Sequence, residues 1–380
     1  MIYLDNAATT WPKPSEVINV MQEAFISGGN PGRGAHNVSL QAARRIFRVR
    51  ETLADFFGFT EPKRVVFTSN ATQALNQALF GLLRPGDHVI TSSLEHNAVF
   101  RPLWALAQQG LEITEVRVDP ESNEFPLQDF EGSFKSNTKL VVTLHASNVT
   151  GTLFPVADIG RIARKNYVPY LVDAAQTAGV FPINMEEMNI DLLAFPGHKG
   201  LLGPQGTGGL IVREGVHLNP IMYGGTGSLS ESDLQPEFFP DVLESGTLNS
   251  LGIAGLGAAL EYLKKIGIEK IRKREQELCQ YLIDGLMQIE GIKIYGGLDA
   301  KTKAPIVSFN LKDVDSTIVG YVLEQEAGII ARSGLHCAPH AHATLGTLKQ
   351  GVVRLSPSHY TTDEEIDTAI KIIRQVATGL

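Results

Sequence analysis

Residues 193–206 have the sequence Leu-Ala-Phe-Pro-Gly-His-Lys-Gly-Leu-Leu-Gly-Pro-Gln-Gly, which places Lys199 between a short apolar run and a glycine-rich turn. A second apolar strand is expected over residues 208–213. A lysine held at a strand end beside His198 is well placed to form a Schiff base with a carbonyl cofactor, once a confined site removes its proton. An exposed loop lysine is the alternative for this segment taken alone.

The residues around this lysine predict an α/β fold. Short β-rich runs alternate with helical stretches from about residue 64 to 215, and helices are expected from about Thr72 and Asn97. The apolar runs are residues 64–67, 88–92, 140–145, 170–173 and 192–195. Continuous apolar strands separated by helices predict a mostly parallel sheet covered on both faces. Ligands of such sheets bind in the loops after the strands.

The pattern changes after about residue 256. A long helical segment is expected from Ala258 to about Ile289, and a final helix from Thr362. Strands are expected over residues 1–5, 304–309, 328–331 and 352–355. We therefore expect two domains: a large one over residues 15–256, and a small α+β domain that joins residues 1–14 to residues 257–380.

Composition excludes several classes of function. The 380 residues carry a formal charge of −8 and lack a basic cluster, which argues against a nucleic-acid partner. No apolar run has the length needed to cross a bilayer, so no membrane association is expected. The N-terminus resembles a strand more than a signal peptide. With two cysteines, Cys279 and Cys337, the chain has no disulfide framework, and a cytoplasmic location fits.

Chemically useful residues follow several of the expected strands. Residues 68–72 join a strand to a helix whose N-terminus is a ready phosphate site, although Asn70 or Thr72 could simply cap that helix. Asp173 ends the most apolar strand. A carboxylate there can pair with a protonated pyridine nitrogen, or with a side chain in a structural salt bridge.

Two further strand-end loops carry His96 and Asn148. The imidazole of His96 could lie flat on a cofactor ring, or be a solvated histidine at a helix start. Asn148 offers a hydrogen-bond donor, or stabilises its own turn. Taken together, successive loops supply a phosphate cradle, a ring stacker, a donor, a pyridinium partner and a Schiff-base lysine.

With these residues in place, the sequence resembles the class V aminotransferase branch of the fold-type-I pyridoxal phosphate (PLP) enzymes, and within it the cysteine desulfurase and selenocysteine lyase group. The resemblance covers nearly the whole chain. Its motifs are residues 3–10, 173–176, 197–199, 244–249, 332–339 and 354–356. It implies a large domain, with a mostly parallel seven-stranded sheet between helices, and a smaller α+β domain.

The resemblance also assigns roles to the residues in its motifs. Lys199 would hold PLP covalently, Asp173 would pair with its ring nitrogen and His96 would stack on the ring. Other contacts would come from Asn148 and Gln176 to the phenolic oxygen, and from Ala71, Thr72 and His198 to the phosphate. One departure is Pro196, which stands near the place where several relatives carry a phosphate-binding serine.

Members of this group are typically homodimers with composite sites. Thr247 would therefore reach a phosphate in the neighbouring subunit. Arg354 would bind the substrate carboxylate, for which a guanidinium supplies bidentate geometry.

Cys337 decides the reaction that the resemblance implies. Its sequence neighbours Arg332, His336, His340 and His342 favour a thiolate. Lys199 would remove the Cα proton of L-cysteine, and the Cys337 thiolate would attack the substrate sulfur, giving L-alanine and a persulfide. A reductant or a sulfur-acceptor protein would then take the sulfur, as in iron–sulfur cluster assembly.

Alternatives remain open at this point. The enzyme could be a selenocysteine lyase, or catalyse another class V reaction as an aminotransferase, epimerase or C–S lyase, with Cys337 an incidental exposed cysteine. A protein that retains PLP without catalysis is a further possibility. A zinc site built from His336, Cys337, His340 and His342 is a rival of another class, but no partner cluster accompanies these residues, and no metal is predicted.

Overall fold

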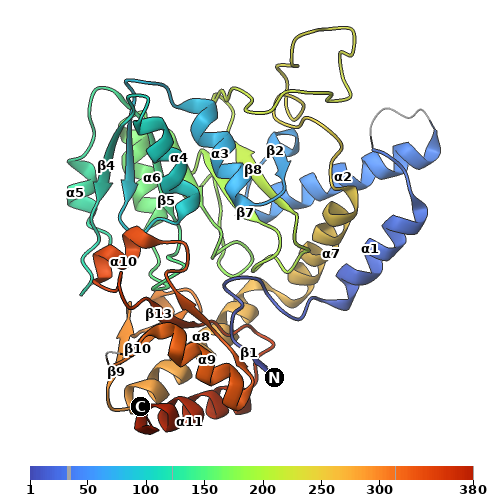
Figure 1. Ribbon diagram of the computed structural model, residues 1–380. Coiled ribbons are helices and arrows are strands. Elements are labelled where there is room, and N and C mark those ends of the chain that lie inside the picture. The colour runs from blue at the N-terminus through green and yellow to red at the C-terminus, as the bar shows by residue number, and fades with distance from the viewer. Residues whose placement is uncertain (32–35, 122, 313, 380) are drawn as a thin grey trace.

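The computed structural model describes residues 1–31, 36–121, 123–312 and 314–379. Its centre is a seven-stranded sheet (Figure 1). In spatial order the strands are β2 (Val65–Thr68), β8 (Gly208–Val212), β7 (Leu192–Pro196), β6 (Tyr170–Asp173), β5 (Thr138–Leu144), β3 (His88–Ser92) and β4 (Glu112–Val116). Neighbours from β7 to β4 are parallel, whereas β8 runs antiparallel to both β7 and β2. This confirms the predicted mostly parallel seven-stranded sheet.

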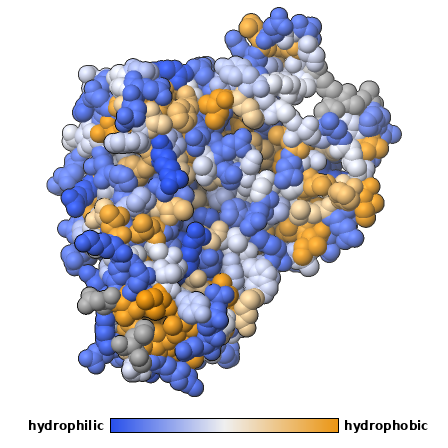
Figure 2. Space-filling view, in the orientation of Figure 1, coloured by the Kyte–Doolittle hydropathy of each residue, from blue (hydrophilic) through white to orange (hydrophobic). Residues whose placement is uncertain are grey.

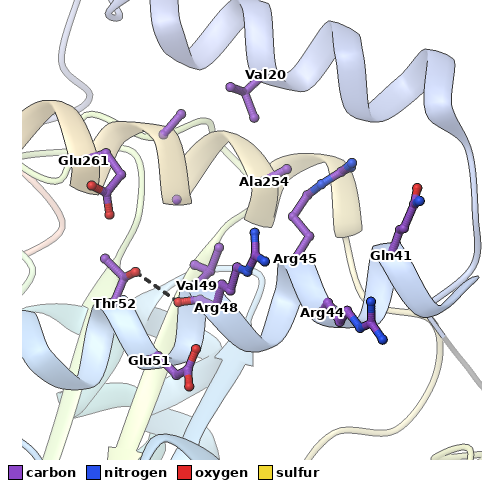
Figure 3. A pocket seen from close by; sticks show the side chains of 12 residues that line it. Val20, Gln41, Arg44, Arg45, Arg48, Val49, Glu51, Thr52, Ala254 and Glu261 are labelled. Atoms are coloured by element: carbon purple, nitrogen blue, oxygen red, sulfur yellow. Dashed lines mark hydrogen bonds between the residues drawn. The ribbon is translucent and has the colours of Figure 1, made fainter. Parts of the chain in front are cut away.

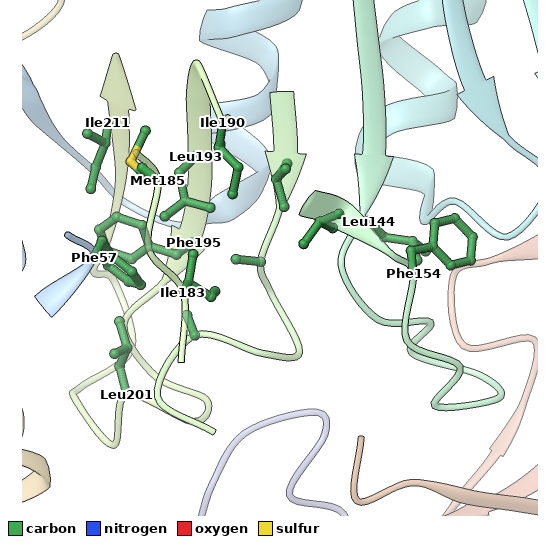
Figure 4. Close-up of a cluster of buried hydrophobic side chains, with 14 of the residues drawn as sticks. Phe57, Leu144, Phe154, Ile183, Met185, Ile190, Leu193, Phe195, Leu201 and Ile211 are labelled. Atoms are coloured by element: carbon green, nitrogen blue, oxygen red, sulfur yellow. The ribbon is translucent and has the colours of Figure 1, made fainter. Parts of the chain in front are cut away.

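Both faces of this sheet are buried, which explains why its strands are continuous apolar runs. Successive side chains of a strand point to opposite faces. In β7, Leu192 and Ala194 join the cluster packed under α3 (Ala71–Leu82) and α4 (Asn97–Ala107). Leu193 and Phe195 join the cluster on the other face, where Phe195 packs against Phe57 (Figure 4).

Helices from several parts of the chain cover that second face. They are α2 (Asn37–Phe56), α5 (Leu127–Glu131), α6 (Val156–Lys165) and α7 (Ser250–Ile266). Helix α1 (Ser15–Ser27) packs along α7 at one side of the molecule (Figure 1). An open groove lies between α1, α2 and α7, and it is lined by Arg44, Arg45 and Arg48 of α2 (Figure 3).

A second unit lies beside the carboxyl ends of the large sheet. It has a four-stranded antiparallel sheet in the order β12 (Arg332–Gly334), β13 (Val352–Leu355), β10 (Val307–Leu311) and β9 (Ile292–Tyr295). Helices α8 (Ile268–Met287), α9 (Ser316–Ala327) and α11 (Asp363–Gly379) pack on this sheet. Near it, β1 (Ile2–Tyr3) pairs in parallel with β11 (Ile329–Ile330). Short elements complete the chain: η1 (Pro62–Arg64), η2 (Ala300–Thr302) and α10 (Pro339–Leu345).

One helix predicted from the sequence is wrong. The single helix expected over residues 258–289 is two helices, because the chain turns at Gly267, whose φ is 90°. That conformation is open to glycine and costly for other residues. The domain boundary predicted at residues 256/257 falls inside α7, and the division into two domains stays a prediction. In the described part of the chain, no helix combines the length and apolarity needed to cross a membrane.

A buried ion pair holds the segment before α7 against the sheet. Arg50 Nη1 donates to Glu244 Oε1 at 2.7 Å, and the backbone N–H of Phe67 donates to the same oxygen at 2.6 Å. The Arg50 guanidinium also lies 4.5 Å from the centre of the Phe67 ring. Because both charges are almost fully buried, each depends on the other.

We expect Glu244→Ala to lower the free energy of unfolding by about 3–5 kcal/mol, because it leaves the Arg50 charge buried without its partner. Urea denaturation measures the loss. Glu112→Ala is the matched control, since it removes the exposed ion pair with Lys135 and should cost less than about 1 kcal/mol. Equal losses in the two variants would contradict this account.

Candidate active site

A cavity lies at the carboxyl ends of β3, β5, β6 and β7. It gathers most of the predicted site residues in one place. Those that line it are Ala71, Thr72, His96, Asn148, Asp173, Gln176, His198 and Lys199. Pro196 lines it as well. The groove between α1, α2 and α7 includes no predicted site residue among the described residues that line it.

Lys199 lies in a tight turn after β7. Gly197 N donates to Thr207 O, and Gly203 N donates to Gly197 O, both at 2.8 Å. A Cβ added at Gly200 would lie 2.6 Å from Ala178 O, so the turn packs too closely for a side chain there. Burial, and then the positive charge of Arg354, lower the pKa of Lys199 from 10.5 to about 8. Its amine is therefore partly neutral near physiological pH.

The N-terminal segment fastens this turn from outside. Thr10 Oγ1 donates to Lys199 O at 3.0 Å, and Lys13 Nζ donates to His198 O at 2.6 Å. His198 Nδ1 lies 3.1 Å from Thr9 Oγ1. Burial first, and then the charge of Lys199, lower the pKa of His198 to about 4. The ring next to the lysine is thus neutral.

Asp173 supplies a buried carboxylate at the end of β6. It is 4% exposed, and its Oδ1 accepts a hydrogen bond from Ala175 N at 2.9 Å. Burial raises its pKa above the usual value, opposed by that hydrogen bond and by the charge of Lys199. No ion pair of the described residues includes Asp173. A cationic group within the cavity would therefore find an acceptor there.

The first turn of α3 lines one part of the cavity. Asn70 caps the helix, because its Oδ1 accepts from Gln73 N at 2.9 Å. Among the hydrogen bonds of the described residues, none uses the backbone N–H groups of Ala71 or Thr72. Free amides at the positive end of a helix dipole bind phosphate well. The predicted helix cap is present at Asn70, and the phosphate site stays a prediction.

His96 begins α4 on another wall of the cavity. Its Nδ1 accepts a hydrogen bond from Ala98 N at 3.0 Å, which requires that nitrogen to be unprotonated. Burial, and then the charge of Lys199, lower the pKa of His96 to about 4. A neutral ring fixed at a helix start suits stacking on an aromatic ligand. Gln176, nearby, donates from Nε2 to Ala7 O at 3.2 Å.

Arg354 lies behind the cavity on β13 and is 2% exposed. Its Nη2 donates to Asp5 Oδ1 and its Nη1 donates to Asn148 O, both at 2.9 Å. Its Nε is buried and has no partner among the described residues. Nε and the second proton of each terminal nitrogen thus remain as donors for a carboxylate. Asp5 is the residue that sequence reasoning missed, although it lies in the N-terminal motif.

Cys337 is exposed in the turn between β12 and α10. It lines a groove together with Thr72 and His96, which also line the cavity, so the thiol borders the site. The cysteine and the lysine come from sequence positions far apart, and the fold brings their surroundings together.

The histidines near Cys337 have separate environments. His340 stacks on Phe100 and its Nδ1 lies 2.9 Å from Glu115 Oε2, whereas His336 and His342 are buried beside each other. Among the described residues, no group of three or more histidines, cysteines and carboxylates could hold a metal ion. The zinc hypothesis therefore has no geometric support here.

Thr247 is exposed and outside the cavity of its own chain. Its predicted contact with a phosphate in a neighbouring subunit stays a prediction.

These residues fit pyridoxal phosphate. The free amides of α3 suit its phosphate, and the unpaired Asp173 carboxylate suits a protonated ring nitrogen. Between these ends lie the Lys199 amine and the neutral His96 ring.

The fold and the cavity agree with the class V aminotransferase family. The family model described as aminotransferase class-V matches residues 2–368, and the chain belongs to this family.

Three proteins similar to this chain are described as cysteine desulfurases. A probable cysteine desulfurase from Methanothermobacter thermautotrophicus is 38% identical and is aligned over 99% of this chain and 94% of its own. The apo structure of a cysteine desulfurase from Thermococcus onnurineus superposes with a TM-score of 0.93 at 33% identity, covering 100% of this chain and 95% of that one. A cysteine desulfurase from Escherichia coli, in an S-sulfonic acid form, gives a TM-score of 0.89 at 27% identity, with coverage of 100% and 95%.

The effect of the Arg354 charge on the pKa of Lys199 should be measurable. We expect Arg354→Gln to raise the pKa of Lys199 by up to about one unit, because it removes a positive neighbour. In the cofactor-free protein, the rate of Lys199 labelling by an amine reagent should reach its midpoint near pH 8, and at higher pH in the variant. Arg101→Gln is the control, because the charge of Arg101 lowers the pKa of His96 and not that of Lys199. An unmoved midpoint in Arg354→Gln would refute this coupling.

Proposed function

We propose that the protein is a PLP-dependent cysteine desulfurase, which converts L-cysteine to L-alanine and leaves a persulfide on Cys337. The observation that carries this proposal is the exposed thiol of Cys337 at the border of the Lys199 cavity, where Thr72 and His96 line both hollows. The names of the similar proteins support the same activity.

The site residues divide the work of the first step. When bound, PLP supplies a carbonyl that links to the substrate amine and a ring that withdraws electrons from Cα. Asp173 holds the ring nitrogen protonated, and the N-terminus of α3 anchors the phosphate. Lys199, with its pKa near 8, takes the Cα proton of the substrate.

Arg354 orients the substrate through its carboxylate. Asp5 and Asn148 each hold one terminal nitrogen of the guanidinium, so the fork is fixed before substrate arrives. A preset guanidinium binds a carboxylate with little loss of side-chain freedom. This fixes which Cα bond lies toward the Lys199 amine.

Sulfur transfer then belongs to Cys337. Its thiolate forms a bond to the substrate sulfur while the bond between that sulfur and Cβ breaks. The electron pair of the broken bond remains on the carbon fragment, which becomes L-alanine after gaining protons. Cys337 keeps the sulfur as a persulfide until a thiol takes it.

We further propose a homodimer and a thiol-bearing acceptor protein. Large apolar side chains are exposed on α1, including Phe25 at 73% and Ile26 at 76%. Figure 2 shows apolar side chains gathered over the region of α1 and α2. We infer that a second copy covers them, and the predicted contact of Thr247 with a neighbouring cavity requires such a copy. The unpaired Cys279 and Cys337 fit a reducing compartment such as the cytoplasm.

A selenocysteine lyase is the closest alternative. The same residues would act on both substrates, and comparing kcat/KM for cysteine and selenocysteine separates the two activities. Transamination, epimerisation and simple C–S lysis would leave Cys337 without a role.

Lys199→Ala tests the cofactor. In the wild-type protein, borohydride should fix PLP to Lys199 and add its mass to the peptide that contains this residue, because the amine is partly neutral inside the cavity. The variant should show no such mass. A purified wild-type protein that is colourless, takes up no PLP and is unchanged by borohydride would refute PLP dependence.

Cys337→Ala tests the reaction. Alanine release from L-cysteine should fall by about 100-fold or more, with no persulfide detectable by mass spectrometry, because the nucleophile is gone. Cys279→Ala is the matched control. Cys279 is 1% exposed in the core of the second unit, so that variant should keep its activity. Undiminished release of sulfide and alanine by Cys337→Ala would exclude the desulfurase mechanism.

A further inference from the structure

The turn that carries Cys337 contains two successive residues in the left-handed region of backbone conformation. His336 has a φ of 50° and Cys337 a φ of 56°. This region costs free energy for residues with a Cβ, so such residues persist where surrounding contacts fix them. The contacts that fix these two peptide units therefore decide where the Cys337 thiol lies.

Two hydrogen bonds hold the carbonyl groups of this pair. Asn148 Nδ2 donates to His336 O at 2.7 Å. The backbone N–H of Asn97, the first residue of α4, donates to Cys337 O at 2.8 Å. Asn148 and the neighbour of Asn97, His96, both line the cavity. The turn is thus fastened directly to the cavity wall.

Asn148 contacts three parts of the site at once. Its side chain lines the cavity, its carbonyl accepts from Arg354 Nη1 at 2.9 Å, and its amide group binds the Cys337 turn. It is 7% exposed, and its Oδ1 is buried without a partner among the described residues. Its Nδ2 carries two protons. One binds His336 O, and the other remains for a ligand in the cavity.

We propose that Asn148 is the positioning residue for the Cys337 nucleophile, because its amide fastens the strained turn beside the cavity. Asn148 acts through the backbone of His336 and does not touch the transferred sulfur in this role. The role of Asn148 in positioning a nucleophile rests on the proposed function. The hydrogen bond from Asn148 to His336 O does not depend on that function.

Two variants remove the donor in different ways. Asn148→Asp keeps the shape of the side chain but cannot donate, and Asn148→Ala removes the group. In the holoenzyme, amide hydrogen exchange over residues 333–339 and at Asn97 should become about 3- to 10-fold faster, as expected for one lost hydrogen bond. The rate at which iodoacetamide alkylates Cys337 should change together with this exchange rate. Cys279 should stay protected because it is buried.

Gln176→Ala is the matched control. It removes another amide that lines the cavity, but Gln176 Nε2 donates to Ala7 O and does not contact the turn. Exchange over residues 333–339 should stay within about twofold of the wild type. Wild-type exchange in Asn148→Asp would overturn the proposal. Equally fast exchange in Gln176→Ala and Asn148→Ala would overturn it too, because then loss of either amide loosens the turn.

A parallel measurement separates this inference from the proposed function. The same proteins are mixed with L-cysteine, and persulfide on Cys337 is quantified by mass spectrometry. The Asn148 variants should form it more slowly than the wild type at equal PLP occupancy. If the wild type forms no persulfide, the proposed function fails, and the exchange comparison still decides whether Asn148 fastens the turn.

Discussion

The site depends first on the hydrogen bonds by which the N-terminal segment holds the lysine turn. Thr10 Oγ1 and Lys13 Nζ donate to the carbonyls of Lys199 and His198, and thereby fix the backbone from which the reactive amine extends. The same segment carries Asp5, which holds Arg354. One stretch of chain thus contacts both the Lys199 turn, which follows β7 of the large sheet, and Arg354, which lies on β13 of the other sheet.

Burial then determines the charge state of the site. It lowers the pKa of Lys199 toward neutrality and keeps His96 and His198 uncharged. The lowered pKa values suit a nucleophilic amine and a stacking ring. The same burial raises the pKa of Asp173, which works against its ionised form, while the hydrogen bond from Ala175 N and the charge of Lys199 work in favour of it. A cationic group in the cavity would favour the ionised carboxylate further.

Sequence alone predicted the large sheet well, because strands buried on both faces are continuous apolar runs such as Leu192–Phe195. It also predicted that the cavity residues lie close together, because parallel strands end at a common edge of the sheet. The break at Gly267 was missed because α7 and α8 together resemble one long helix. The hydrogen bonds between Arg354 and Asp5 and between Asn148 and His336 join residues far apart in the sequence. No local sequence pattern could therefore reveal them.

The pairing of β1 with β11 has a consequence for synthesis on the ribosome. Leu4 N donates to Ile330 O, and Ser356 N donates to Leu4 O, so this strand finds its partners only after residues 329–356 have been synthesised. The large sheet can form before then, while residues 2–5 remain undocked. Thr10 and Lys13 can bind the lysine turn as soon as that turn has been made, whereas the contact of Asp5 with Arg354 must form later.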